Sequence, residues 1–317
     1  MEARQTTAAE AATDATTVRP TGRQIDLESG PYRATITEVG ATLRALSHDG
    51  RALIAGFGAD EIMPEFNGAL LAPWPNRVRD GRYDFGGRTH QLALSEPQRA
   101  TALHGLVAWQ AWSLGSTSRE SAELSTVLFP QRGYPFLLIL TARYRLTREG
   151  LSIEIEAVNT GATAAPYGVA MHPWFVAGAD PLADWTLTLP AGSVLATDDR
   201  LLPTGTRGVA GDFDFRSGRR LDDLELDHAF TAIEFTEGKA HATLVSPAGA
   251  GVDISWDEAC RWLQVCTGDA AGPKLRRRAV AIEPMTCAPD AFNSGEGLVR
   301  LDPGQTHRVH WRFAAIT

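Results

Sequence analysis

From about residue 24 onward, short runs of strand-forming residues alternate with turns rich in Gly and Pro. Residues 33–39 alternate small or apolar residues with polar ones, and residues 151–158 place apolar side chains at nearly every second position. This period of two is typical of a strand with one buried face. No segment carries apolar residues at i, i+3, i+4 and i+7 over three turns, so the pattern predicts strands and no long amphipathic helix.

Two hairpins are predicted, one around Gly86-Gly87 and one around residues 147–150, because each turn separates two strand-like runs. Many strands joined by Gly/Pro turns indicate one large antiparallel β-sandwich, an all-β fold. A pair of βαβ domains is disfavoured, since crossover helices are missing from the pattern. The strand-like runs are residues 33–39, 82–85, 89–94, 136–146, 151–158, 185–189, 241–245, 252–256, 261–266, 279–283 and 307–313.

The start of the chain has a different character. Residues 1–23 are rich in Ala and Thr and almost devoid of large apolar side chains, which predicts a disordered tail. No Gly/Ser-rich or Pro-rich linker interrupts the rest, so residues 24–317 are expected to form a single sandwich domain.

Composition narrows the class of protein. The chain has 317 residues, 44% of them hydrophobic, and a formal charge of −8, which argues against a nucleic-acid or anionic-membrane partner. No run approaches the ~20 apolar residues of a membrane span, and the N-terminus lacks the apolar core of a secretory signal. Three cysteines without a Cys-x-x-Cys pair suit a reducing compartment, so a cytoplasmic location is expected.

Several common catalytic motifs are missing from the sequence. There is no G-x-x-x-x-G-K-[ST] loop, no G-x-G-x-x-G after a strand and no G-x-S-x-G elbow. Nucleotide-binding and serine-hydrolase chemistry therefore have little support.

Titratable residues stand among glycines, prolines and aromatics at four places: Asn76-Arg77, His104, His172 and Glu283. Each histidine has a plainer interpretation as a hydrogen-bonded core residue. Glu283 ends the apolar run 279–282 and precedes Pro284, which cannot donate to a β-ladder. A carboxylate there is either an edge-strand residue facing water or a partly desolvated base with a raised pKa.

Five segments containing these residues, taken in order, resemble the aldose 1-epimerase (mutarotase) family, and most closely its bacterial branch. The resemblance covers the chain from about residue 30 to the end. Each motif is weak alone, and the signal lies in their order. The segments are Asn76-Arg-Val-Arg-Asp-Gly-Arg-Tyr83, Leu103-His-Gly105, His172-Pro-Trp-Phe175, Leu226-Asp-His-Ala-Phe230 and Ile282-Glu-Pro-Met-Thr-Cys287, the last followed by Pro289-Asp-Ala-Phe-Asn293.

The resemblance implies a galactose-mutarotase-like β-sandwich that interconverts the α and β anomers of an aldohexose without a metal or other cofactor. It implies that Glu283 is the general base at the anomeric hydroxyl and His172 the general acid at the ring oxygen. It also implies that His104 and Arg77 hold the sugar and the developing charge, and that Asp227 binds ring hydroxyls. The expected partner is a monosaccharide, galactose or glucose, and the oligomeric state stays open.

Asn76 and Trp174 complete the expected sugar-binding set. The sequence departs from the family pattern at two positions, Leu106 and Trp174 itself. Leu106 stands where the family usually has a second glycine after the histidine, which affects the loop that carries His104. Trp174 replaces the usual tyrosine of the His-Pro-Tyr-Phe motif, which affects contacts with the hydroxyls. Aromatic rings at Trp74, Trp109 and Trp174 are candidates for stacking on a sugar face, although tryptophan in sheets is often core.

Four alternatives stay open at this level. A hexose-6-phosphate 1-epimerase needs cations on a phosphate, for which Arg77, Arg79 and Arg82 are candidates. A glycosidase would use Glu283 with Asp227. A metal enzyme would use the two histidines with Glu283, without any supporting ligand spacing. A non-catalytic carbohydrate-binding module would need aromatics and hydrogen bonds but no acid–base pair.

Overall fold

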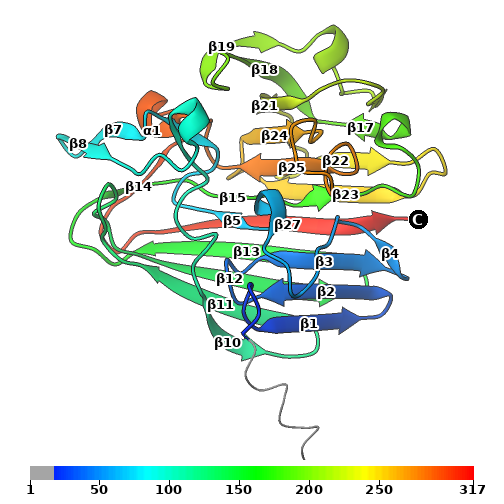
Figure 1. Ribbon diagram of the computed structural model, residues 1–317, viewed down its shortest axis with the longest axis horizontal. Coiled ribbons are helices and arrows are strands. Elements are labelled where there is room, and N and C mark those ends of the chain that lie inside the picture. Colours follow the sequence, from blue (N-terminus) through cyan, green and yellow to red (C-terminus); the bar gives the residue numbers. More distant parts are fainter. Residues whose placement is uncertain (1–17) are drawn as a thin grey trace, which may run out of the picture.

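The computed structural model describes residues 18–317, and these consist mainly of antiparallel strands (Figure 1). Most of the tail expected over residues 1–23 lies outside the described residues. Thr21, within the described part, is buried. Among residues 18–317 no helix is long and apolar enough to cross a membrane.

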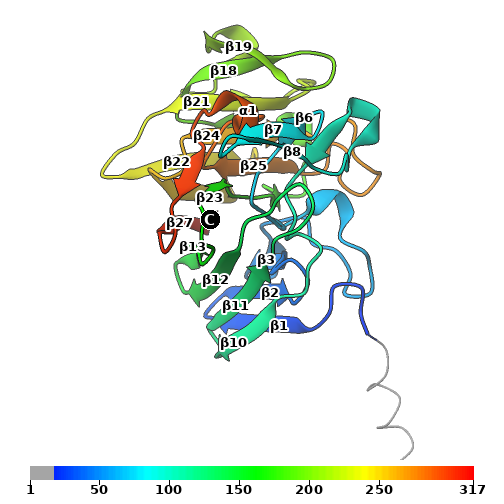
Figure 2. The same ribbon diagram turned by 90° about the vertical axis from the view of Figure 1, so that its left-hand side faces the viewer.

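A nine-stranded sheet forms one layer of the molecule. A four-stranded sheet packs over one half of it and an eight-stranded sheet over the other half, as the two perpendicular views show (Figures 1 and 2). The strands of the nine-stranded sheet, in spatial order, are β10 (Ser113–Thr117), β11 (Ser121–Leu128), β12 (Leu138–Thr147), β13 (Gly150–Asn159), β27 (Thr306–Ile316), β23 (Gly251–Asp257), β22 (Lys239–Val245), β17 (Thr186–Thr188) and β20 (Arg219–Arg220).

The two smaller layers carry the remaining long strands. The four-stranded sheet has the order β1 (Gln24–Ser29), β2 (Tyr32–Thr37), β3 (Leu43–His48), β4 (Arg51–Ala52). The eight-stranded sheet comprises β19 (Pro203–Gly208), β18 (Ala191–Thr197), β21 (Asp227–Ile233), β24 (Trp262–Cys266), β25 (Val280–Met285), β15 (Ala170–Met171) and β5 (Leu70–Leu71), with β16 (Trp174–Phe175) also paired to β25.

Short elements connect the layers at one end of the molecule. Three two-stranded ribbons pair β6 (Arg77–Arg79) with β9 (Thr101–Leu103), β7 (Arg82–Phe85) with β8 (Arg88–Gln91), and β14 (Ala165–Tyr167) with β26 (Val299–Leu301). The helical turns are η1 (Pro64–Phe66), η2 (Pro97–Arg99), η3 (Leu182–Asp184), η4 (Gly211–Phe213) and α1 (Ala291–Ser294).

The core fills the space between the layers, because alternate side chains of each strand point inward. In β12 and β13 every second residue is buried, as the period of two predicts. Phe175 of the eight-stranded sheet meets Phe313 of the nine-stranded sheet edge to face, with ring centroids 5.0 Å apart. The predicted all-β antiparallel sandwich is confirmed.

Arg51, at the end of the four-stranded sheet, ties several distant segments together. Its guanidinium donates hydrogen bonds to the carbonyl oxygens of Ala177 at 3.2 Å, Gly251 at 3.0 Å and Ile316 at 2.9 Å. Gly251 and Ile316 belong to β23 and β27 of the nine-stranded sheet, and Ala177 lies in the loop after β16, so one side chain ties the four-stranded sheet to both.

The prediction that the strand carrying Glu283 stops before Pro284 is wrong. β25 continues to Met285, and Pro284 pairs in register with Leu263 of β24. Thr286, two residues after Pro284, donates its N–H to Val169 on the other side of β25. In an antiparallel strand the backbone nitrogens of residues i and i+2 point to the same side, so the nitrogen of Pro284 faces the same side as that of Thr286. That side lies at the break between β15 and β16, where the missing N–H of Pro284 disrupts no ladder.

Candidate active site

A polar cavity of about 260 Å³ opens on the eight-stranded sheet. Side chains that point to one face of this sheet make its floor, and they come from β21, β24, β25 and the segment between β15 and β16. β15 and β16 pair with β25 in one continuous register on either side of a break, and that register places His172 opposite Glu283. The other predicted site residues, Asn76, Arg77, His104, Trp174 and Asp227, also line this cavity.

Glu283 and His172 form a buried pair at the centre of the floor. Nε2 of His172 lies 3.3 Å from Oε1 of Glu283, and the two residues are 7% and 1% exposed respectively. The alternative of a solvated edge-strand glutamate is therefore wrong, since Glu283 sits inside a sheet and out of water.

Desolvation pushes the pKa values of the pair in opposite directions, because burial disfavours the charged form of each group. It raises the pKa of Glu283 well above the ordinary carboxyl value, and the nearby Asp227 carboxylate raises it further, while Arg77 works in the opposite direction. It lowers the pKa of His172 to about 4. Both groups are thus favoured in their neutral forms in the free protein.

Each member of the pair also has one polar atom without a partner. Among residues 18–317, neither Nδ1 of His172 nor Oε2 of Glu283 makes a hydrogen bond, although both atoms are buried. Buried polar groups in folded proteins are normally paired. Two unpaired atoms on one buried pair at the cavity floor are therefore candidate contacts for a ligand's polar groups.

Asp227 lies two strands away from Glu283 on the same face of the sheet. Its Oδ1 accepts a hydrogen bond of 2.6 Å from the amide of Gln264, and Gln264 is the register partner of Glu283 on β24. Gln264 therefore fixes the position of Asp227 and spaces the two carboxyl groups apart.

His104 is held by the loop that carries Asn76. The N–H of Asn76 donates to Nδ1 of His104 at 3.2 Å, and the N–H of His104 donates to the carbonyl of Asn76 at 2.9 Å. Because Nδ1 accepts, neutral His104 carries its proton on Nε2. Burial, and then the proximity of His172 and Arg77, lower the pKa of His104 well below its usual value, which keeps it neutral.

The backbone at this loop is constrained on both sides. Asn76 and His104 both have left-handed φ values, 56° and 61°. Gly105 follows with φ 75°, and a Cβ there would collide with the carbonyl of Ala72. Leu106, where the family usually has glycine, packs against the core and donates its N–H to Ala72 at 2.7 Å, so the loop accommodates this departure.

Arg77 is locked by a carboxylate that the sequence did not single out. Its Nε and one terminal nitrogen donate to the two oxygens of Glu96 at 2.8 and 3.0 Å. Thr101 and Arg99 also bind Glu96, at 2.6 and 3.2 Å. This bidentate pair fixes the guanidinium plane at the cavity wall.

The three tryptophans named as stacking candidates have different environments. Trp74 is 3% exposed and donates to the carbonyl of Ala102, so it belongs to the core. Trp174 lines the cavity but is also only 3% exposed, and its Nε1 donates to Glu65 at 3.3 Å. Trp109 is 54% exposed and packs against Phe66, whose ring in turn contacts His104.

Two cavity residues were missed from the sequence, Gln264 and Glu96. Gln264 carried a usable signal, because it is the polar residue in the otherwise apolar run 262–266, as Glu283 is in its own strand. Glu96 had none, since its pairing with Arg77 depends on how the ribbon of β6 and β9 folds back.

Side-chain geometry also bears on the metal alternative. Within residues 18–317 no three His, Cys, Asp or Glu side chains are grouped so that they could hold a metal ion. The arrangement of His104, His172 and Glu283 therefore does not fit a metal-binding triad.

The family model described as aldose 1-epimerase matches residues 23–314. This chain belongs to the aldose 1-epimerase family. It is therefore placed among isomerases of the mutarotase type, as the resemblance predicted.

Relatives of this aldose 1-epimerase family member extend over nearly its whole length. It is 36% identical over 302 residues to the uncharacterized protein YihR of Escherichia coli K12, covering 94% of this chain and 95% of that protein. It is 27% identical over 335 residues to galactose mutarotase of Bos taurus, covering 93% and 94%.

Solved structures share the fold at lower identity. The aldose epimerase homologue from C. elegans superposes with a TM-score of 0.81 at 22% identity, covering 93% of this chain and 99% of that one. Galactose 1-epimerase from Lactobacillus acidophilus superposes with a TM-score of 0.76 at 24% identity, covering 93% and 95%. The expected galactose-mutarotase-like fold of this family member is confirmed.

Proposed function

We propose that this protein is an aldose 1-epimerase that interconverts the α and β anomers of a neutral aldohexose by opening and reclosing its ring. The observation that carries the proposal is the buried pair of Glu283 and His172, with Nε2 and Oε1 3.3 Å apart at the floor of a polar cavity. The cavity is smaller than the ~300–1,000 Å³ of sites for drug-sized ligands, which suits a single sugar ring.

Ring opening requires two proton transfers. The Glu283 carboxylate takes the proton of the anomeric hydroxyl, a carbonyl forms at C1, and the bond between C1 and the ring oxygen breaks. His172 delivers a proton to the leaving ring oxygen. Rotation about the C1–C2 bond and the reverse transfers close the ring as the other anomer. Each transfer by a positioned side chain contributes typically ~10²–10⁴-fold to the rate.

The resting protonation state fits a reaction with no net proton uptake. In the free protein burial favours a protonated Glu283 beside a neutral His172. Moving that proton from Oε1 to Nε2 creates the carboxylate and the imidazolium that the reaction needs. Arg77 favours the ionised form of Glu283, so its positive charge helps this step.

The remaining residues hold the sugar in this scheme. His104 presents the N–H of its Nε2, Arg77 presents its fixed guanidinium, and the Asp227 carboxylate accepts from ring hydroxyls. Asn76 shapes the loop below His104. Trp174 forms one wall of the cavity and does not offer an open face for stacking.

Charges in and around the cavity favour a neutral sugar over a phosphorylated one. Arg77 and Arg99 both bind Glu96, and the cavity also holds Glu65 and Asp227, so three carboxylates face two arginines even with Glu283 protonated. The other two candidate cations point elsewhere: Arg79 pairs with Asp290 at 3.4 Å, and Arg82 is exposed outside the cavity. A hexose 6-phosphate remains the alternative substrate that the experiment includes.

The test is anomer exchange, measured by NMR or polarimetry on freshly dissolved α-D-galactose, α-D-glucose and glucose 6-phosphate. Wild type is expected to accelerate exchange of a neutral hexose. Glu283→Gln, whose amide cannot accept the proton, is expected to lose about 10²-fold or more. Saturation by glucose 6-phosphate at far lower concentration than glucose would favour the phosphate branch.

Two other results would replace the proposal. Tight sugar binding without any change in exchange would make the protein a carbohydrate-binding module. Release of nitrophenol from aryl glycosides would make it a glycosidase. A wild-type rate in Glu283→Gln would remove Glu283 from the role of base.

We also propose a cytoplasmic location, which is supported by three cysteines that are all free thiols.

A further inference from the structure

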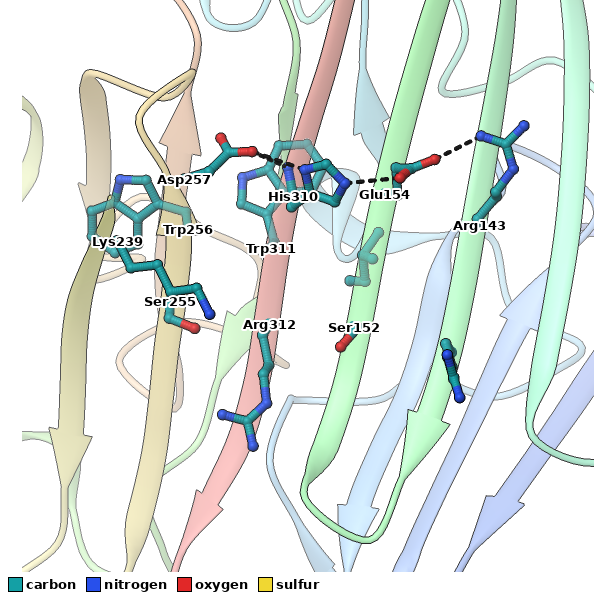
Figure 3. Close-up of a pocket in the computed structure, with 12 residues that line it drawn as sticks. Arg143, Ser152, Glu154, Lys239, Ser255, Trp256, Asp257, His310, Trp311 and Arg312 are labelled. Atoms are coloured by element: carbon teal, nitrogen blue, oxygen red, sulfur yellow. Dashed lines mark hydrogen bonds and ion pairs between the residues drawn. The ribbon is translucent and has the colours of Figure 1, made fainter. Parts of the chain in front are cut away.

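A second cavity, of about 540 Å³, lies on the outer face of the nine-stranded sheet (Figure 3). It spans five neighbouring strands, β12, β13, β27, β23 and β22, and shares no residue with the candidate active site. Side chains on this face stand in rows across the strands, because register partners lie side by side.

One row is a chain of ion pairs that neutralise one another. Arg143 binds Glu123 at 2.8 Å and Glu154 at 2.7 Å. His310 lies between Glu154 and Asp257, at 2.8 and 2.9 Å from their carboxylates, as Figure 3 shows. Three carboxylates and two basic side chains are thus satisfied within this row.

The neighbouring row, two residues along each strand, has a different composition. It carries basic side chains separated by serines and contains no carboxylate. Small serines between long cationic side chains leave hollows at the sheet surface, which accounts for the cavity. In order across β11, β12, β13, β27, β23 and β22 the row reads Ser121, Arg145, Ser152, Arg312, Ser255 and His241.

Three cations at this cavity have no acidic partner. Among residues 18–317, Arg145, Arg312 and Lys239 make no ion pair with a carboxylate. Arg312 is held in place by donating to the carbonyl of Glu149 at 2.6 Å. Lys239 starts in the ion-paired row and extends toward Ser255 in Figure 3. This excess of positive charge is local, since the whole chain carries a formal charge of −8.

We propose that this cavity binds a phosphate group, with Arg145 and Arg312 on either side, the Ser152 hydroxyl between them, and Lys239 at the edge. Arginine side chains suit a tetrahedral oxyanion because each presents paired N–H donors, and serine adds a hydroxyl donor. The site is independent of the proposed isomerase activity, because it lies on another sheet and uses none of the same residues. Its ligand is either free phosphate or a phosphate monoester of a small metabolite.

The proposal is tested by calorimetric titration at low ionic strength, where charges are least screened. The probes are inorganic phosphate and α-glycerophosphate, with glycerol as the neutral control. The double variant Arg145→Gln/Arg312→Gln is compared with Arg300→Gln/Arg308→Gln, which removes the same charge from arginines paired to carboxylates outside the cavity. Thermal melts verify that each variant is folded.

Wild type and the matched control are expected to bind alike, and the cavity variant to bind at least about tenfold more weakly. Lys239→Gln is expected to weaken binding as well, whereas Lys274→Gln, the change at the only other lysine, is not. Tighter binding of α-glycerophosphate would identify a monoester as ligand, and equal binding would identify free phosphate. No binding by wild type, or equal losses in both double variants, would overturn the proposal.

Discussion

At the scale of single residues, the raised pKa of Glu283 should be visible in the rate of the proposed reaction. Protonated Glu283 beside neutral His172 holds the one proton that the reaction moves to His172, so kcat/KM falls as pH rises through the pKa of Glu283 and the pair loses that proton. Asp227 is one cause of the raised value, after burial. We predict that Asp227→Asn moves this alkaline limb to lower pH, because removing a negative neighbour lowers the pKa of Glu283.

The measurement is the pH profile of kcat/KM for both proteins. Asp227 is also proposed to bind the sugar, so the variant is expected to be slower at every pH. The position of the limb, and not its height, therefore reports the electrostatic effect. A limb that stays in place or moves to higher pH would contradict the assignment.

The same carboxyl group links folding stability to pH. A group whose pKa is raised on folding stabilises the folded state below its unfolded pKa, and this contribution is lost as pH rises through the folded pKa. At mildly alkaline pH the folded wild type must therefore keep Glu283 protonated or ionise it away from water, and either one lowers the free energy of unfolding. We predict that Glu283→Gln raises Tm by a few degrees at pH 8 and that the gain shrinks toward pH 5.

Scanning calorimetry at several pH values checks this prediction. Glu65→Gln is the matched control, since Glu65 lines the same cavity and is exposed. A gain in Tm that does not depend on pH would point to packing and away from ionisation.

At the scale of elements, the His104 loop depends on the glycine that follows. Gly105→Ala combines a left-handed φ with a collision against Ala72. We predict a loss of more than about 1 kcal/mol in unfolding free energy together with a lower kcat/KM. Urea unfolding and anomer exchange provide the two measurements.

Gly86→Ala separates backbone strain from the collision. Gly86 has φ 60° in the hairpin between β7 and β8, and a Cβ there meets nothing within 4 Å. It should lose some stability and keep full activity. If both variants behave alike, the contact between Gly105 and Ala72 is unimportant.

The elements also show how far the sequence could predict the site. Period-two alternation located β12 and β13, because burial on one face selects the side-chain type. The strand of Glu283 was located by the continuous apolar run 279–282, since every residue of β25 is buried. Pro284 led to a wrong strand end, since its missing N–H matters only if a neighbour needs it, and that depends on the break between two short strands. The pairing of Arg77 with Glu96 was equally hidden, because it depends on register between segments distant in sequence.

That the side chains of His172 and Glu283 act together at one site was predicted only through the family resemblance. Their sequence positions are far apart, and nothing local specifies that β15, β16 and β25 share one register. The sequence did identify both residues as polar groups in apolar company. That observation located the side chains, and the fold was needed to bring them within 3.3 Å.

At the scale of the whole molecule, Arg51 adds three hydrogen bonds between segments far apart in the sequence. Arg51→Met leaves the carbonyls of Ala177, Gly251 and Ile316 without that donor. We predict a loss of about 2 kcal/mol in unfolding free energy, with activity unchanged, because Arg51 does not line the active-site cavity.

Urea unfolding followed by tryptophan fluorescence measures this loss. Arg88→Met is the control, since Arg88 is exposed and makes no ion pair or side-chain hydrogen bond within residues 18–317. Equal stability of the two variants would show that the three hydrogen bonds contribute no more to the free energy of unfolding than hydrogen bonds from the same groups to water.

The unpaired atoms of His172 and Glu283 also suggest that ligand binding can be followed through the melting temperature of the protein. A sugar that satisfies them binds the folded chain and not the unfolded one, so mass action raises the melting temperature with ligand concentration. A panel of aldoses could thus be ranked by thermal shift on Glu283→Gln, which holds its ligand without turning it over. The sugar that raises the melting temperature most at equal concentration would be the preferred one, identified before any rate is measured.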